Sequence, residues 1–74
     1  MTVREIIAEI SGYVWKIETQ EGAKVEENDT LIILESMKME IPILAPEDGT
    51  VKEIRVKTGE TVNEGAVVAL LEIE

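Results

Sequence analysis

The chain has 74 residues, of which 45% are hydrophobic, and its formal net charge is -9. This length predicts one small domain, residues 1–74, of modest stability, because a small domain buries only part of its surface on folding. The chain has no cysteine and no histidine. That composition removes disulfides and the usual nucleophile–base pairs, and no carboxylates are paired by spacing, so we expect no catalytic site, no metal site and no enzyme.

The acidic charge and the N-terminal sequence also limit the possible partners. Nucleic acids and anionic membranes both attract basic surfaces, so a net charge of -9 argues against either one. Residues 1–5 contain no signal-peptide core, and no stretch approaches the roughly 18 apolar residues of a membrane span. We therefore expect a soluble, cytoplasmic protein, and its charge favours a monomer.

Short runs of high β propensity alternate with turn residues along the chain. Such runs predict strands, and no segment shows a sustained 3.6-residue period with helix caps, so we expect no long helix. In the first strand Ile17 has the opposite parity to Val14, and in the fourth strand Ile54 and Val51 repeat this irregularity, which predicts a bulge in both. The predicted strands are residues 13–19, 31–36, 39–44, 51–57 and 67–72.

Residues 35–40, between the second and third predicted strands, read Glu-Ser-Met-Lys-Met-Glu. If the two strands form a hairpin, Met37 and Lys38 make a two-residue loop, in which both residues need positive φ. Met-Lys is a poor choice for such a turn, and local rules tend to fail at functional positions. The amine of Lys38 then stands at a rigid tip. A plain solubilising lysine, with Met37 or Met39 packed into the core, is the alternative.

The sequence repeats itself after 37 residues, half of its length, without a gap. Two copies of a unit that cannot bury its own face should pack on each other, which predicts an all-β sandwich or flattened barrel with a pseudo-two-fold axis. The partner of Lys38 in the repeat is Met1, so we expect the tip to lie opposite the termini. The ten identical pairs are Ile6/Ile43, Ala8/Ala45, Gly12/Gly49, Val14/Val51, Ile17/Ile54, Gly22/Gly59, Val25/Val62, Glu27/Glu64, Leu34/Leu71 and Glu35/Glu72.

The run from Glu35 to Met39 resembles the attachment signature of biotinyl domains in the biotinyl/lipoyl attachment domain family, of the biotin carboxyl carrier type. The resemblance covers essentially the whole chain and implies two four-stranded antiparallel sheets in a flattened barrel. Ser36 departs from the alanine that is most common in the family. The sequence shows no Ala/Pro-rich linker of the kind that larger carriers have, so we expect either a small standalone attachment protein or an excised domain. The other matching motifs are Gly12-x-Val14, Gly22-x-x-Val25, Leu34-Glu35, Ala45-Pro46-x-x-Gly49-x-Val51 and Gly59-x-x-Val62.

The resemblance also implies a function and a set of partners. A biotin protein ligase would attach biotin covalently to Lys38 through an amide. The biotin would then carry a carboxyl group between the sites of a biotin carboxylase and a carboxyltransferase. We assign Met37 and Met39 to recognition by the ligase or presentation of the biotin, with Glu35 and Ser36 as the flanking motif. The charge of Glu35 is a candidate for discrimination between ligases.

Two other functions remain open at this point. A lipoyl carrier shares the fold and would hold lipoate on Lys38, although its tip typically reads Asp-Lys-Ala where this chain has Met37-Lys38-Met39. An unmodified β-sandwich adaptor, whose acidic surface binds a basic protein, would carry no cofactor.

Overall fold

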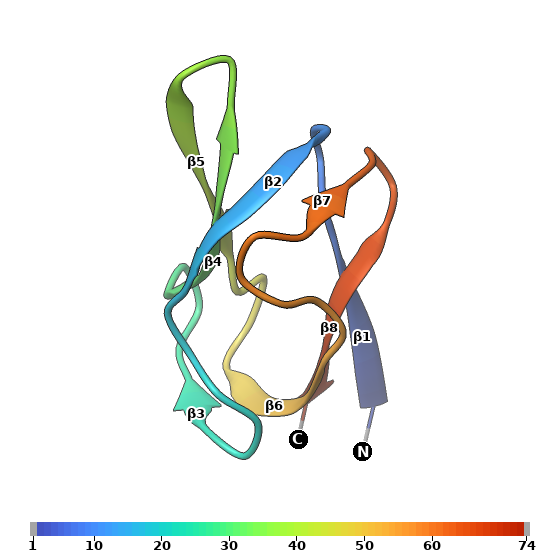
Figure 1. The fold of residues 1–74 in the computed structure, drawn as a ribbon. Coiled ribbons are helices and arrows are strands. Elements are labelled where there is room, and N and C mark those ends of the chain that lie inside the picture. Colours follow the sequence, from blue (N-terminus) through green and yellow to red (C-terminus); the bar gives the residue numbers. More distant parts are fainter. Residues whose placement is uncertain (1, 74) are drawn as a thin grey trace.

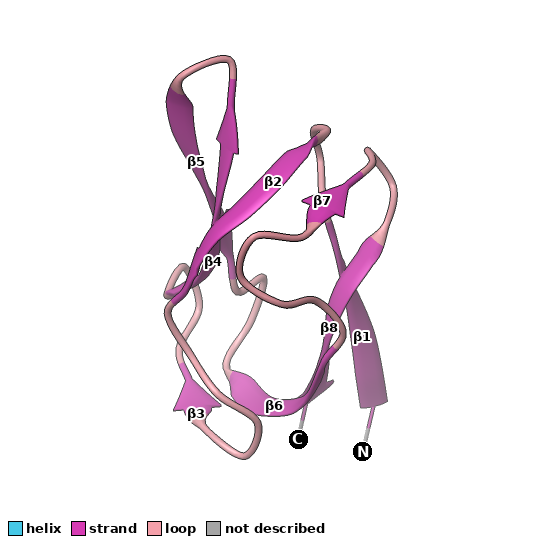
Figure 2. Cartoon of the chain, in the orientation of Figure 1, coloured by secondary structure: helices cyan, strands magenta, loops and turns pink. Residues whose placement is uncertain are grey.

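The computed structural model describes residues 2–73, which form eight strands and no helix (Figure 1, Figure 2). Six strands have six or seven residues, while β3 and β7 have two each. The predicted all-β class is confirmed. The strands are β1 (Thr2–Ile7), β2 (Gly12–Ile17), β3 (Lys24–Val25), β4 (Thr30–Ser36), β5 (Met39–Leu44), β6 (Gly49–Ile54), β7 (Thr61–Val62) and β8 (Val67–Ile73).

The strands form two four-stranded antiparallel sheets that follow the sequence repeat. One sheet has the order β1-β8-β6-β3 and the other β5-β4-β2-β7. A shift of 37 residues converts each strand of the second sheet into the strand at the same place in the first, so each sheet contains two strands from each half of the chain. The predicted flattened barrel with internal pseudo-two-fold symmetry is therefore confirmed.

Both predicted bulges are present at equivalent positions. The register between β2 and β4 shifts between Val14 and Lys16, which leaves Trp15 without an opposite residue. In the other half the register between β6 and β8 shifts between Val51 and Glu53, around Lys52. A bulge turns the strand, and β2 and β6 accordingly end earlier than the predicted runs 13–19 and 51–57.

The core lies between the two sheets and consists only of aliphatic residues. Every strand contributes at least one buried side chain, and no polar side chain among the described residues is buried. Each fully buried Leu, Ile or Val contributes roughly 1.5–3 kcal/mol relative to exposure, which supports a fold without disulfides or metals. The largest fully buried side chains are Leu31, Ile32, Leu34, Leu71, Val14, Val51 and Val68.

The β4–β5 hairpin projects from one end of the elongated molecule, which measures 36 × 17 × 17 Å (Figure 1). At the other end Thr2 of β1 pairs with Ile73 of β8. The ends of the described chain therefore lie side by side, away from the hairpin tip. Met1, the repeat partner of Lys38, lies outside the described residues.

Candidate functional site

The tip of the β4–β5 hairpin has the predicted register. Glu35 pairs with Glu40 and Ser36 with Met39, so Met37 and Lys38 form the two-residue loop. Their φ values are 51° and 65°, as a type I′ turn requires. A left-handed conformation costs an L-residue roughly 1–2 kcal/mol. The paired strands therefore hold the Lys38 backbone in a conformation that its own sequence disfavours.

All three side chains at the tip extend into solvent. Met37 is 90% exposed, Met39 is 63% exposed, and Lys38 is also exposed. The alternative in which one methionine packs into the core is wrong for both. The reason is geometric: β2, the neighbour of β4 in the same sheet, pairs with it only as far as Glu35, so the tip extends beyond the neighbouring strand.

The hairpin is held against β2 by a close backbone contact. A Cβ atom added to Gly12 would lie 2.6 Å from the carbonyl oxygen of Glu35 and 3.3 Å from the Cβ of Ser36. Only glycine allows this approach without a shift of the backbone. Ser36 is accordingly half-buried at the base of the tip.

Tyr13 lies beside Glu35, a neighbour that sequence reasoning missed. The two residues pair across β2 and β4. The Glu35 carboxylate, as a hydrogen-bond acceptor for the Tyr13 hydroxyl, raises the pKa of Tyr13, and partial desolvation and the carboxylate charge add to this effect. The contact is non-local, so only the strand register could have revealed it.

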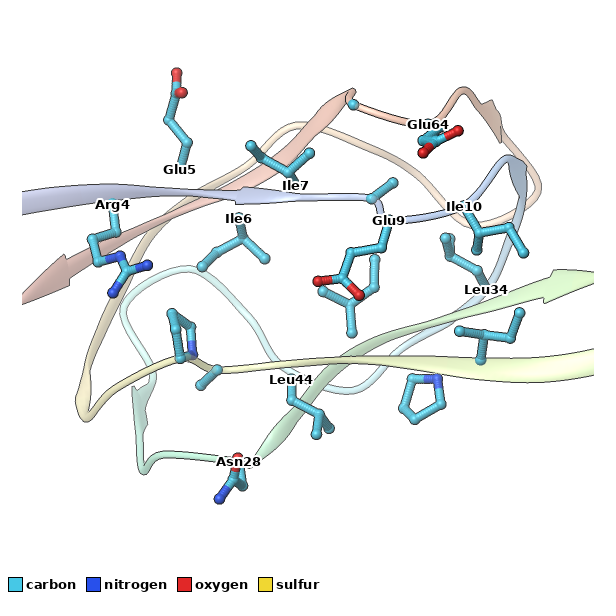
Figure 3. A pocket seen from close by; sticks show the side chains of 17 residues that line it. Arg4, Glu5, Ile6, Ile7, Glu9, Ile10, Asn28, Leu34, Leu44 and Glu64 are labelled. Atoms are coloured by element: carbon cyan, nitrogen blue, oxygen red, sulfur yellow. The ribbon is translucent and has the colours of Figure 1, made fainter.

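A groove of about 690 Å³ runs between β1 and β5, the edge strands of the two sheets. In Figure 3 Ile6 points from β1 toward β5, and the Glu9 carboxylate lies at the groove. The lining is mostly apolar and comes from two equivalent segments, residues 4–10 and 41–46. Lys38 is not part of this groove, so the candidate site is the hairpin tip and not a cavity.

Residues 2–73 contain neither a candidate metal-ion cluster nor a candidate membrane-spanning helix. Among these residues no cluster of three or more His, Cys, Asp or Glu side chains could hold a metal ion. Within the same range no helix is long and apolar enough to cross a membrane.

Comparisons with known proteins extend these observations. The family described as "Biotin-requiring enzyme" matches residues 2–71. The biotin/lipoyl attachment protein of Bacillus subtilis is 48% identical over 60 residues, which cover 81% of this chain and 82% of that protein. Pyruvate carboxylase of Bacillus subtilis is 45% identical over 69 residues, 93% of this chain but 6% of the carboxylase.

A solved structure shows the same arrangement of strands. The urea carboxylase of Kluyveromyces lactis superposes with a TM-score of 0.90 and 34% identity, over 96% of this chain and 6% of that enzyme. The chain thus corresponds to a small part of each carboxylase and to most of the attachment protein. With its match over nearly all residues, the two four-stranded sheets and the Met-Lys-Met hairpin, this chain belongs to the biotin/lipoyl attachment family.

Proposed function

We propose that this chain is a biotin carboxyl carrier and that Lys38 is the residue that biotin modifies. The observation that carries the proposal is the geometry of Lys38 in a chain of this family. Its backbone is fixed by a two-residue turn at the end of the molecule, and its side chain is exposed. An amine in this position can enter the active site of another enzyme without any rearrangement of the fold.

The described residues around Lys38 suit a covalent biotin. None of them forms an ion pair with the Lys38 amine, and no neighbouring strand covers it. The Lys38 Nζ would lose a proton and attack the acyl carbon of biotin activated as its adenylate, so that an amide forms and AMP leaves. The ligase must promote loss of this proton, because only a neutral amine has a lone pair for the attack.

The residues that flank Lys38 would act in recognition. Met37 and Met39 present flexible, polarizable side chains of the kind that adapt to a partner surface. Glu35 adds a negative charge at the stem, and Ser36 keeps the stem close to Gly12. We assign these four residues to docking on the biotin protein ligase and to presentation of Lys38.

The chain would carry a group and would not catalyse its transfer. Bound biotin would supply the site that accepts and releases a carboxyl group. This chain would hold it on a tether that reaches a biotin carboxylase and then a carboxyltransferase, and tethering raises its effective concentration at both. Names of carboxylases among its relatives support these partners. We propose that residues 1–74 act as one domain and as a monomer. We also propose that the chain works in the cytoplasm, because the ligase reaction consumes ATP.

Mass spectrometry of the intact chain tests this function. The chain is incubated with purified biotin protein ligase, biotin and ATP, and fragmentation then locates the added mass. One biotinyl group on Lys38 is expected. The Lys38→Arg variant should fold as the parent does and gain no mass, because guanidinium is not a nucleophile at neutral pH. Lys24→Arg, a control at another exposed lysine, should be modified as the parent is.

Three outcomes would contradict the proposal. Biotin on Lys38→Arg would show that another residue is the acceptor. Lipoate on Lys38 in cells that are given both cofactors would make the chain an acyl or electron carrier. A chain that stays unmodified with active ligase would favour the adaptor function.

A further inference from the structure

The chain has two aromatic residues, and both lie on the surface of the same strand. Tyr13 is 37% exposed and Trp15 is 40% exposed, and both belong to β2. No other tyrosine or tryptophan and no phenylalanine occurs in the sequence. Aromatic side chains usually contribute their large apolar area to a core. Tyr13 and Trp15 are not part of this core, so packing of the core does not explain why they occur in β2.

The internal repeat shows whether the fold itself needs aromatic residues at these positions, because β6 is the equivalent of β2. The equivalents of Tyr13 and Trp15 are Thr50 and Lys52 in β6, which has the same length, the same sheet position and the same bulge. The fold therefore builds this strand equally well with a threonine and a lysine. Folding does not require aromatic residues in β2, so a function of the Lys38-bearing sheet is the remaining reason for them.

The two aromatic residues continue the surface of the hairpin stem. Tyr13 pairs with Glu35, which pairs in turn with Glu40, one step below the Ser36–Met39 pair that closes the turn. At about 3.3 Å per residue, Tyr13 lies roughly 10 Å from the tip and Trp15 roughly 7 Å further. Trp15 occupies the bulge, so both it and Lys16 are turned outward.

The surface has the composition of a docking site for a protein with basic groups. Exposed Tyr and Trp are the residues that most often dominate binding energy at interfaces. Two carboxylates accompany them, those of Glu35 and Glu40, which lie opposite each other across the hairpin stem. Tyr13 lies opposite Glu35 across β2 and β4, which places the ring beside the hairpin.

We propose that Tyr13 and Trp15 form a second recognition site for the biotin protein ligase, next to the Met37-Lys38-Met39 tip. This inference rests on the proposed function. The partner surface would offer an apolar hollow for Trp15 and basic side chains opposite Glu35 and Glu40. Neither aromatic residue would touch the reacting atoms, so both set affinity and specificity.

The geometry of amide formation favours the ligase over a carboxylase as the occupant. The Lys38 Nζ must reach the adenylate inside the ligase, and the lysine side chain is roughly 6 Å long. The ligase surface must therefore approach the hairpin backbone, and an interface of about 800 Å² on each partner extends over the stem and β2. A carboxylase site meets biotin at the end of a longer arm and can leave the stem uncovered.

Ligase kinetics with matched variants test the inference. In Tyr13→Thr/Trp15→Thr, β2 receives at position 13 the residue that β6 already has, and an uncharged β-branched residue at the bulge. The control Lys52→Thr makes the same change at the equivalent bulge of β6. We expect the KM of the double variant to rise about tenfold or more with kcat nearly unchanged, and that of the control to stay at the parent value.

Conservative variants and a folding check keep the test decisive. Tyr13→Phe and Trp15→Phe retain a ring and should recover most of the affinity, while circular dichroism should show the parent fold in every variant. An unchanged KM for the double variant, or an equal rise for Lys52→Thr, would overturn the inference and leave Lys38 attachment standing. If the double variant has a normal KM for the ligase but slower carboxyl transfer, the aromatic residues serve the carboxylase, and the inference is overturned as well. If the parent chain gains no biotin, the proposed function fails as well.

Discussion

Individual residues at the hairpin tip adopt a backbone conformation that their own side chains disfavour. Elsewhere in the chain, turns with positive φ use residues that tolerate it: Asn28 has φ 73° and its repeat partner Gly65 has φ 90°. At the tip Met37 and Lys38 take the same region without such a side chain. The two strands of the hairpin supply the free energy that keeps them there. A turn built from Asn-Gly would be easier to form but could not present an amine.

Tyr13 permits a test of the stem at the scale of one residue. Its pKa is raised, first by the hydrogen bond to Glu35 and then by desolvation and the carboxylate charge. Since this is the only tyrosine in the chain, its titration can be followed by ultraviolet absorbance. We expect a pKa above the ordinary value of about 10. In Glu35→Ala that pKa should fall back toward the ordinary value, because hydrogen bond and charge are both lost.

The sign of the effect on stability follows from the direction of the shift. Because the pKa is raised in the folded state, the Tyr13–Glu35 contact stabilises the fold fully below pH 10 or so and is lost as the pH rises through the folded-state pKa. Glu72→Ala changes the repeat partner of Glu35 and should leave the titration unchanged. A parent chain that titrates at or below the ordinary pKa would contradict the hydrogen bond.

At the scale of elements, the β2–β4 contact connects the core to the hairpin. Gly12 opens β2 and lies against the backbone of Glu35, and Gly49 opens β6 and lies against Glu72 in the same way. An added Cβ at Gly49 would lie 2.5 Å from the Glu72 carbonyl oxygen. The same steric requirement therefore acts twice, once beside the hairpin tip and once at the opposite end of the molecule.

The variants Gly12→Ala and Gly49→Ala separate the two consequences of this contact. Each should lower the free energy of unfolding by about 2 kcal/mol, because backbone must move to accept the methyl group. Only Gly12→Ala should also slow biotinylation of the folded protein, since it displaces the base of the hairpin. Denaturant unfolding and ligase rates measure the two effects. Equal ligase rates for both variants would show that the hairpin does not depend on this contact.

The sequence predicted the elements that have a clear pattern and missed those that depend on distant contacts. The repeat and the irregular parity of Val14 and Ile17 predicted both bulges, and residues 35–40 predicted the hairpin register. The predicted runs left out β1, which pairs only with the distant strand β8. They also left out β3 and β7, which have two residues each, too few for any periodicity to show. The contact of Tyr13 with Glu35 depends on the β2–β4 register, which local pattern does not contain.

At the scale of the whole molecule, the repeat preserves shape while charge varies. The ion pair Lys16–Glu18 in one half corresponds to Glu53–Arg55 in the other, with the signs exchanged and a distance of 3.5 Å in both. A third pair, Arg4–Glu47 at 2.7 Å, connects β1 to the loop between β5 and β6. All three are exposed, and exposed pairs contribute only about 0–1 kcal/mol each. Sixteen acidic residues against seven basic ones therefore leave a net repulsion.

This repulsion should make the stability of the molecule depend on salt. At 0.15 M the Debye length is about 8 Å, well below the length of the molecule, so added KCl screens most carboxylate pairs. We expect a gain of about 1 kcal/mol between low and physiological salt, which for a domain of this size raises Tm by about 4–8 °C. In the variant Glu5→Gln/Glu9→Gln the loss of two carboxylates changes the net charge from -9 to about -7. That variant should melt higher at low salt and respond less to KCl. A parent Tm that falls as KCl is added would show that the exposed ion pairs outweigh the repulsion.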